Sequence, residues 1–311
     1  MKKVLIAFLV ALILIPAFAF ASGSKEAAAG STANKQLVIG MSVPGLQFPF
    51  FVTMKNDAEK AAAALGAKIV FADAQNQSAK QASDVENFIA QGVDAILISP
   101  MTTDSLVPAI EDAVKAGIPV ATVDRKANTD KVLVHVGADN VQGGRAAAQF
   151  IIDKLGNKGT VIELEGTPGS SAAIDRKNGF DEVMNKSNVK ILVSQNAEFD
   201  RAKGQNVMES LIQKYPKFDA VFGANDEMII GAIEAMSGAG IDPASKVTIG
   251  FDATPDAFQY MKEGKLNATI DQFPGKQAGQ ALQYLSDYIK NKTKPAKAVV
   301  YINPEPVTKA P

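Results

Sequence analysis

The 311-residue sequence predicts an α/β fold of two lobes, each built on a doubly wound parallel sheet. From Leu37 onward one unit recurs: a short apolar strand, a loop, an amphipathic helix that ends at a glycine, and the next strand. The strands are apolar along their whole length, which is typical of parallel strands buried on both faces. These units are too numerous for one open sheet and lack the eightfold pattern of a barrel, so two lobes are the better interpretation.

The first part of the chain contains four such strands. We expect strands at 38–43, 68–71, 95–98 and 119–123, with helices at 50–65, from about 79 to 92 and from about 104 to 117. Glycine stands just after each helix, where the backbone turns left-handed and other residues are strained. The alternation continues with strands at 160–164, 190–193, 220–222 and 247–251, each followed by a helical stretch.

The N-terminus predicts an exported protein. Lys2 and Lys3 precede an apolar run that is too short to span a bilayer, and Ala19-Phe20-Ala21 has the small-x-small pattern of a cleavage site. We therefore expect a signal peptide over 1–21, cleaved after Ala21, which places the mature protein in the periplasm; an uncleaved anchor is the alternative. Residues 22–36 are small and polar, as in a flexible tether.

Composition excludes several classes of function. The chain has 32 basic and 33 acidic side chains, and this mild balance gives no reason to expect nucleic acid as a partner. The chain has no cysteine, which excludes disulfides, thiolate metal sites and cysteine catalysis. The single histidine, His135, lies in an apolar run and is more typical of a structural residue than of a metal ligand or a catalytic triad.

Ligands of doubly wound sheets bind beyond the carboxyl ends of the strands, so the residues that follow each strand are the candidates for a site. They comprise aromatic rings, carboxylates, guanidiniums and amides: Phe48, Phe50, Phe51, Asp124, Arg125, Arg176, Phe199, Asn225, Asp252 and Gln272. Aromatic rings cover the apolar faces of a sugar, while Asp accepts, Arg donates and Asn or Gln does both around its hydroxyls. The set therefore favours a neutral polyol as ligand.

Each of these residues also has a structural interpretation when taken alone. Phe50 and Phe51 are typical of a core, Asp124-Arg125 of a solvated pair, and Asp252 and Asn225 of helix N-caps. It is the convergence of all of them at strand ends that favours a binding site.

These residues, in this order, resemble a periplasmic monosaccharide-binding protein of the ribose/galactose type, the solute receptor of an ABC importer. The resemblance runs from about Leu37 to the C-terminus. It rests on these segments: Pro49-Phe50-Phe51, Val123-Asp124-Arg125, Asp139-Asn140, Ala173-Ile174-Asp175-Arg176, Glu198-Phe199-Asp200-Arg201, Asn225-Asp226-Glu227-Met228, Gly250-Phe251-Asp252 and Thr269-Ile270-Asp271-Gln272-Phe273-Pro274.

The resemblance implies a type I periplasmic binding protein, whose two lobes are joined by a three-crossover hinge. The N-terminal lobe would hold 37–138 and 273–300, and the C-terminal lobe 139–272 and 301–311. Phe50 and Phe199 would sandwich the sugar ring, with Phe51 beside Phe50, and the polar residues would bind the hydroxyls. The implied partners are a monosaccharide and an ABC permease in the inner membrane, with a chemoreceptor as a further candidate; we expect a monomer without cofactor or metal.

Two positions depart from the ribose-binding pattern. Pro44 and Phe48 stand where that pattern has serine and asparagine, so one corner of the pocket loses two hydrogen-bonding groups and gains a ring. A hexose, a deoxysugar or a furanose is then as plausible a ligand as ribose.

Other classes of function explain less of the sequence. Asp124 and Asp252 are a conceivable carboxylate pair for an exported glycosidase, but no other feature indicates hydrolysis. A dinucleotide enzyme lacks its glycine fingerprint after the first strand. A receptor that presents a sugar or furanose signal to a chemoreceptor or sensor kinase would share the fold, and the sequence leaves this alternative open.

Overall fold

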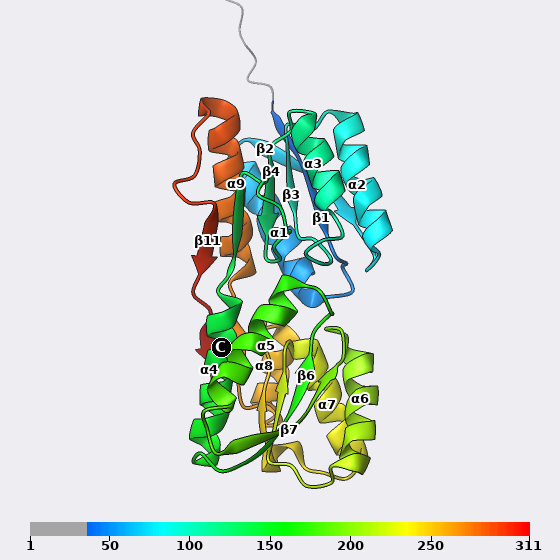
Figure 1. Ribbon diagram of the computed structural model, residues 1–311, viewed down its shortest axis with the longest axis vertical. Helices are drawn as coiled ribbons and strands as arrows, with labels where there is room; N and C mark the ends of the chain where they lie inside the picture. The colour runs from blue at the N-terminus through cyan, green and yellow to red at the C-terminus, as the bar shows by residue number, and fades with distance from the viewer. Residues whose placement is uncertain (1–35) are drawn as a thin grey trace, which may run out of the picture. The chain divides into compact units, whose positions relative to one another are not determined.

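The computed structural model describes residues 36–311 (Figure 1). The predicted signal peptide, and the predicted tether except its last residue, lie outside the described residues. Helices and strands alternate along nearly the whole described chain. None of the helices within 36–311 is long and apolar enough to cross a membrane.

The N-terminal lobe is built on a six-stranded parallel sheet in the order β11-β5-β4-β3-β1-β2. Its strands are β1 (Leu37–Val43), β2 (Ala67–Asp73), β3 (Ala95–Ile98), β4 (Val120–Val123), β5 (Val134–Ala138) and β11 (Val299–Ile302). Its helices are α1 (Pro49–Ala64), α2 (Ser78–Gln91), α3 (Val107–Lys115) and α9 (Pro274–Asn291). All four residues of β3 are buried, which is the expected behaviour of a strand covered on both faces.

Alternation along β3 separates two apolar layers. Leu97 packs in the larger core together with Phe51 of α1. Ile96 packs in a second core together with Phe88 of α2 and Ile110 of α3. Figure 1 shows α2 and α3 together beside the sheet, apart from α9. The sheet is therefore doubly wound, as predicted.

The C-terminal lobe is built on a four-stranded parallel sheet in the order β7-β6-β8-β9. Its strands are β6 (Gly159–Glu165), β7 (Val189–Asn196), β8 (Ala220–Gly223) and β9 (Val247–Ile249), and β10 (Thr269–Asp271) pairs antiparallel with β12 (Glu305–Val307). Its helices are α4 (Asn140–Leu155), α5 (Ser171–Met184), α6 (Arg201–Lys214), α7 (Asp226–Gly238) and α8 (Pro255–Lys262), with a short 3₁₀ turn at Pro243–Ser245.

The chain passes between the two sheets three times. It leaves β5 for α4 after Ala138, returns from β10 to α9 through Gln272 and Phe273, and leaves β11 for β12 after Ile302. The three crossings confirm the predicted fold class, two doubly wound lobes joined by a three-crossover hinge.

One predicted helix start is wrong. The helix expected from about Asp104 begins at Val107, because Thr102 and Ser105 form a local turn first. In that turn the Ser105 N–H donates to Thr102 Oγ1 at 3.2 Å, an alternative to helical bonding that Ser and Thr side chains offer. The glycine ends are as expected: Gly92 and Gly117 have φ of 63° and 84°.

His135 is a structural residue of β5. Its ring is buried, and Nδ1 lies 3.0 Å from Thr122 Oγ1 on the neighbouring strand. Burial, reinforced by the nearby cation of Lys126, lowers the pKa of His135 to about 3, so the ring is neutral at physiological pH.

Candidate functional site

All ten predicted site residues line one pocket, joined by Ala172 of α5. The pocket is small, and its lining combines four aromatic rings with six polar or charged side chains. It is lined from both lobes at the carboxyl ends of the strands, where a ligand of an open α/β sheet is expected.

The aromatic wall of the N-terminal lobe comes from the start of α1. Phe48 precedes the helix, and Pro49 begins it with a fixed φ that suits the first turn. Phe50 and Phe51 are edge-to-face with ring centroids 5.1 Å apart, and Phe48 meets Phe51 in the same way at 6.3 Å. The three rings are nearly fully buried and present an apolar surface to the pocket.

Phe199 is the aromatic contribution of the C-terminal lobe. Its φ is 62°, a left-handed conformation that is unfavourable for a bulky residue, and its N–H donates to Met228 Sδ at 3.2 Å. The ring lies against Gly166 in the loop after β6, where a Cβ would overlap it. Strained backbone of this kind concentrates at functional sites, where the surrounding structure holds it in place.

Asp124 and Arg125 follow β4 directly. Asp124 is left-handed, with φ of 62°, and Ser99 Oγ donates to its carboxylate at 3.1 Å. Arg125 donates through Nη1 to the Met101 carbonyl at 3.1 Å, and its Nε lies 3.7 Å from Asp124. That Nε makes no hydrogen bond to any residue of the described chain, so a buried donor is left for a ligand.

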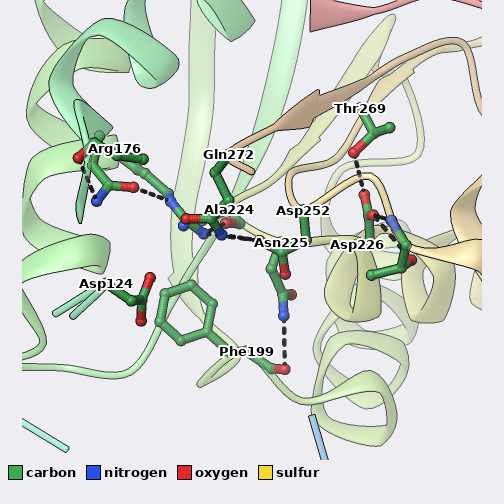
Figure 2. A network of polar contacts seen from close by, with 12 residues as sticks. Asp124, Arg176, Phe199, Ala224, Asn225, Asp226, Asp252, Thr269 and Gln272 are labelled. Atoms are coloured by element: carbon green, nitrogen blue, oxygen red, sulfur yellow. Dashed lines mark hydrogen bonds and ion pairs between the residues drawn. The ribbon is translucent and has the colours of Figure 1, made fainter. Parts of the chain in front are cut away.

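Arg176 is held in the C-terminal lobe by contacts on both sides of its guanidinium. Nε donates to Asn140 Oδ1 at 2.8 Å, and Nη1 donates to the Ala224 carbonyl at 2.7 Å (Figure 2). The group also stacks on the Phe251 ring at 3.7 Å and lies 3.7 Å from an Asp252 oxygen. These contacts fix the planar fork before any ligand binds.

Asn225, Asp252 and Gln272 complete the wall. Asn225 caps α7 by accepting from the Met228 N–H at 3.0 Å and donates to the Phe199 carbonyl at 3.1 Å (Figure 2). Gln272 donates to Asp252 at 2.6 Å. Asp252 does not cap the following helix, because Thr254 does so.

The charges of the pocket cancel. Asp124 and Asp252 face Arg125 and Arg176, and all four are buried. Burial raises the pKa of Asp124, and that of Asp252 well above its usual range, although the arginines oppose the shift. Burial likewise lowers the pKa of Arg125 to about 10 and lowers the pKa of Arg176, although the neighbouring carboxylates oppose both shifts. A site with balanced, desolvated charges suits a neutral ligand rich in hydrogen-bonding groups.

The two lobes also touch each other directly along one edge of the pocket. The Thr103 N–H donates to the Gly169 carbonyl at 3.0 Å, and the Lys126 N–H donates to Ser171 Oγ at 2.8 Å. Lys126 Nζ forms an ion pair with Asp175 at 3.0 Å. In this structure the two lobes are therefore in contact with each other, and the pocket lies between them.

Some features of the site escaped the sequence prediction. Ser99, which holds Asp124, was not singled out, although it stands directly after β3 and the same signal points to it. Asn140, which holds Arg176, stood in a segment of the resemblance but was given no role in the site. Pro44, expected to reshape a corner of the pocket, is not among its lining residues, whereas Phe48 is. Within the described residues, no group of three or more His, Asp or Glu side chains is arranged to hold a metal ion.

The fold and the site define a two-lobed protein with a pocket of aromatic and polar side chains between its lobes. The periplasmic binding protein domain family matches residues 39–293, and this chain belongs to that family.

Sequence and structural relatives agree with this assignment. The chain is 47% identical over 251 residues to the ribose import binding protein of Bacillus subtilis, covering 80% of this chain and 81% of that protein. It is 37% identical over 270 residues to the galactofuranose-binding protein of Escherichia coli, covering 84% and 85%. A Caulobacter myo-inositol binding protein bound to myo-inositol is similar in structure, with a TM-score of 0.83, 35% identity, and coverage of 88% of this chain and 93% of that chain.

Proposed function

We propose that this protein is an extracytoplasmic solute-binding protein that captures a monosaccharide between its lobes and delivers it to an ABC importer. The observation that carries the proposal is the pocket itself. It combines an aromatic wall with a charge-balanced set of acceptors and donors, contributed by both lobes. Ribose, galactofuranose and myo-inositol, the ligands in the names of similar proteins, are neutral polyols of the kind that such a pocket fits.

In this proposal the ring lies between Phe50 and Phe199, with Phe51 beside Phe50. The hydroxyl ligands are the remaining polar residues: Asp124, Arg125, Arg176, Asn225, Asp252 and Gln272. Each hydroxyl that donates to a buried carboxylate replaces the water which that carboxylate loses on closure. Charge-assisted hydrogen bonds of this kind are roughly twice as strong as neutral ones. Phe48 sets the size of one corner and thereby the choice among sugars.

Capture follows from closure of the hinge, the known behaviour of periplasmic binding proteins. In the open form each lobe carries half of the site, and a sugar that contacts both halves favours the closed form. The equilibrium shifts only by the difference in affinity of the ligand for the two forms. The direct contacts near Lys126 join the two lobes, so they stabilise the closed form itself and thereby raise the apparent affinity for the sugar.

Export and delivery complete the proposal. The predicted signal peptide, cleaved after Ala21, would release the protein into the periplasm, and residues 22–36 would form a flexible tether before the folded part. From the sequence, the two domains would be 37–138 with 273–300, and 139–272 with 301–311. Because Tyr301 and Ile302 pair with β5, the last boundary would move to just after Ile302. The membrane partner would be a permease that recognises the closed form, and one cleft per chain requires only a monomer.

The test is a melting-temperature panel on residues 22–311, with D-ribose, D-allose, L-arabinose, D-galactose and myo-inositol. A ligand at a thousandfold excess over Kd stabilises the folded state by about 4 kcal/mol, which is a shift of several degrees. D-Glucuronate and D-glucosamine are matched charged controls that the balanced pocket should reject. A clear shift with one or two neutral sugars and none with the controls supports the proposal. A shift only with the charged sugars, or with none of the panel, contradicts it.

A further inference from the structure

A buried carboxylate behind the pocket holds three of its lining segments together. Asp226, the first residue of α7, is fully buried and does not line the pocket. Its Oδ1 accepts from Thr269 Oγ1 at 2.7 Å, and its Oδ2 accepts from the N–H and Oγ1 of Thr254 at 2.8 and 3.0 Å. Figure 2 shows Asp226 and Thr269 beside the pocket residues Asn225 and Asp252.

Further contacts connect the backbone around Asp226 to this carboxylate and to its partners. The Asp226 N–H donates to the Phe251 carbonyl at 2.7 Å, and a Cβ on Gly250 would overlap Asp226 Oδ1. Thr269 Oγ1, while donating to Asp226, also accepts from the Ala253 N–H at 3.1 Å. One carboxylate thus joins the start of α7, the turn after β9 and the strand β10.

The turn that it holds is strained. Asp252 and Ala253 have φ of 116° and 53°, two consecutive non-glycine residues with positive φ. Each such residue costs on the order of 1–3 kcal/mol and persists only where its surroundings hold it. The turn carries Asp252 into the pocket, and the end of β10 carries Gln272, which donates to Asp252.

We propose that Asp226 is a positioning residue of the ligand site: with Thr269 and Thr254 it holds the strained turn so that Asp252 and Gln272 meet the ligand in one geometry. The inference rests on the proposed function. Asp226 touches no ligand, and its effect passes through hydrogen bonds to the two segments. Loss of these bonds lets the turn relax and leaves Asp252 away from the ligand hydroxyl.

Two substitutions of Thr269 separate positioning from packing. Thr269→Val keeps the shape and removes the hydroxyl, whereas Thr269→Ser keeps the hydroxyl and loses a methyl group. If Thr269 only fills space, Val is the better replacement. If it links Asp226 to the turn, Ser is the better one, so the two interpretations predict opposite orders of affinity.

The experiment is calorimetric titration of wild type and variants with D-ribose, or, if ribose does not saturate the wild type, with D-allose, L-arabinose and myo-inositol in turn. We expect Thr269→Val to weaken binding by roughly tenfold, from the loss of a buried hydrogen bond to the Asp226 carboxyl group. Thr269→Ser should stay within about twofold of wild type on the same reasoning. Asp226→Asn, which keeps one acceptor, should fall between wild type and Thr269→Val.

The matched control is Glu163→Gln. Glu163 is a buried carboxylate of the same lobe, bonded to Ser194 and Lys177 and to none of the pocket residues. Its replacement should change the melting temperature without changing Kd. Melting curves of every variant show that it is folded, and Asp226→Asn and Thr269→Ser carry the test if Thr269→Val does not fold.

The inference is overturned if Thr269→Val and Asp226→Asn bind as tightly as wild type, or if Thr269→Ser binds as weakly as Thr269→Val. If the wild type binds a sugar and the variants bind it equally well, the inference is refuted and the proposed function is not. A wild type that binds no sugar of the panel refutes the proposed function, and this inference with it.

Discussion

Replacing Lys126 by methionine should weaken sugar binding about fivefold while leaving the ligand-free protein folded. Lys126 follows the Asp124-Arg125 pair of the N-terminal lobe, and its Nζ forms an ion pair with Asp175 on α5 of the C-terminal lobe at 3.0 Å. Nζ also donates to the Tyr301 hydroxyl on β11, within its own lobe, at 3.1 Å. Although burial disfavours the cation, its hydrogen bonds to Asp175 and Tyr301 raise the pKa of Lys126, so it is charged at neutral pH.

The magnitude follows from the exposure of the pair. The side chains of Lys126 and Asp175 are 32% and 21% exposed, so solvent screens part of their attraction. A partly exposed ion pair of this kind contributes about 1 kcal/mol, and about 1 kcal/mol is about a fivefold change in Kd. Since the pair joins the lobes only in the closed form, the whole loss appears in ligand affinity.

Calorimetric titration of Lys126→Met, Asp175→Asn and the double variant measures this contribution. The double variant should be no weaker than either single variant, because the two substitutions remove the same interaction. Tyr301→Phe is the matched control: it removes the contact of Lys126 within its own lobe and should leave Kd within about twofold on the same screening argument. Wild-type affinity in Lys126→Met, or an equal loss in Tyr301→Phe, would refute the assignment of Lys126 to closure.

Three further predictions concern the C-terminal lobe. Gly166→Ala should weaken binding between about fivefold and a hundredfold by titration, since its Cβ would overlap the Phe199 ring and move it, a packing change that costs about 1–3 kcal/mol. Arg176→Lys keeps the charge but loses the fork that bonds Asn140, so binding should be lost while circular dichroism shows a folded protein. Burial raises the pKa of Glu163 from 4.5 to about 7, so the folded state keeps a proton that the unfolded state releases, and stability falls as pH rises across that window. Glu163→Gln should remove this component, about 3 kcal/mol, from unfolding curves measured between pH 4 and 8.

The residues that line the pocket could be predicted from the sequence because their positions follow from the topology of the sheets. The carboxyl ends of parallel strands meet at one edge, so residues such as Asp124 and Asn225, placed directly after apolar strands, come together whatever the details of packing. The same reasoning, with the family resemblance, was sufficient to predict the two lobes and the three crossings.

Long-range pairing and backbone strain were not predictable in this way. Nothing in the short segment Val299–Ile302 predicts that it pairs with β5, and nothing in Glu305–Val307 predicts that it pairs with β10. The register between distant strands is decided only in the assembled sheet. The positive φ values of Phe199 and Ala253 could not be predicted, because Phe and Ala do not favour that conformation. Asp226 stood in a recognised segment, but only the folded structure shows its three hydrogen bonds.

The central claim is that the pocket between the lobes binds one neutral monosaccharide. Calorimetric titration of residues 22–311, wild type beside Asp252→Asn, with the sugar that gives the largest melting shift tests it most directly. The account predicts one site per chain in the wild type. It predicts binding roughly tenfold weaker in the variant, because an amide nitrogen replaces one acceptor oxygen of a buried carboxyl group and leaves a sugar hydroxyl without its acceptor, a loss of about 1–3 kcal/mol. Equal affinity in the two proteins, or no binding by the wild type, would contradict it.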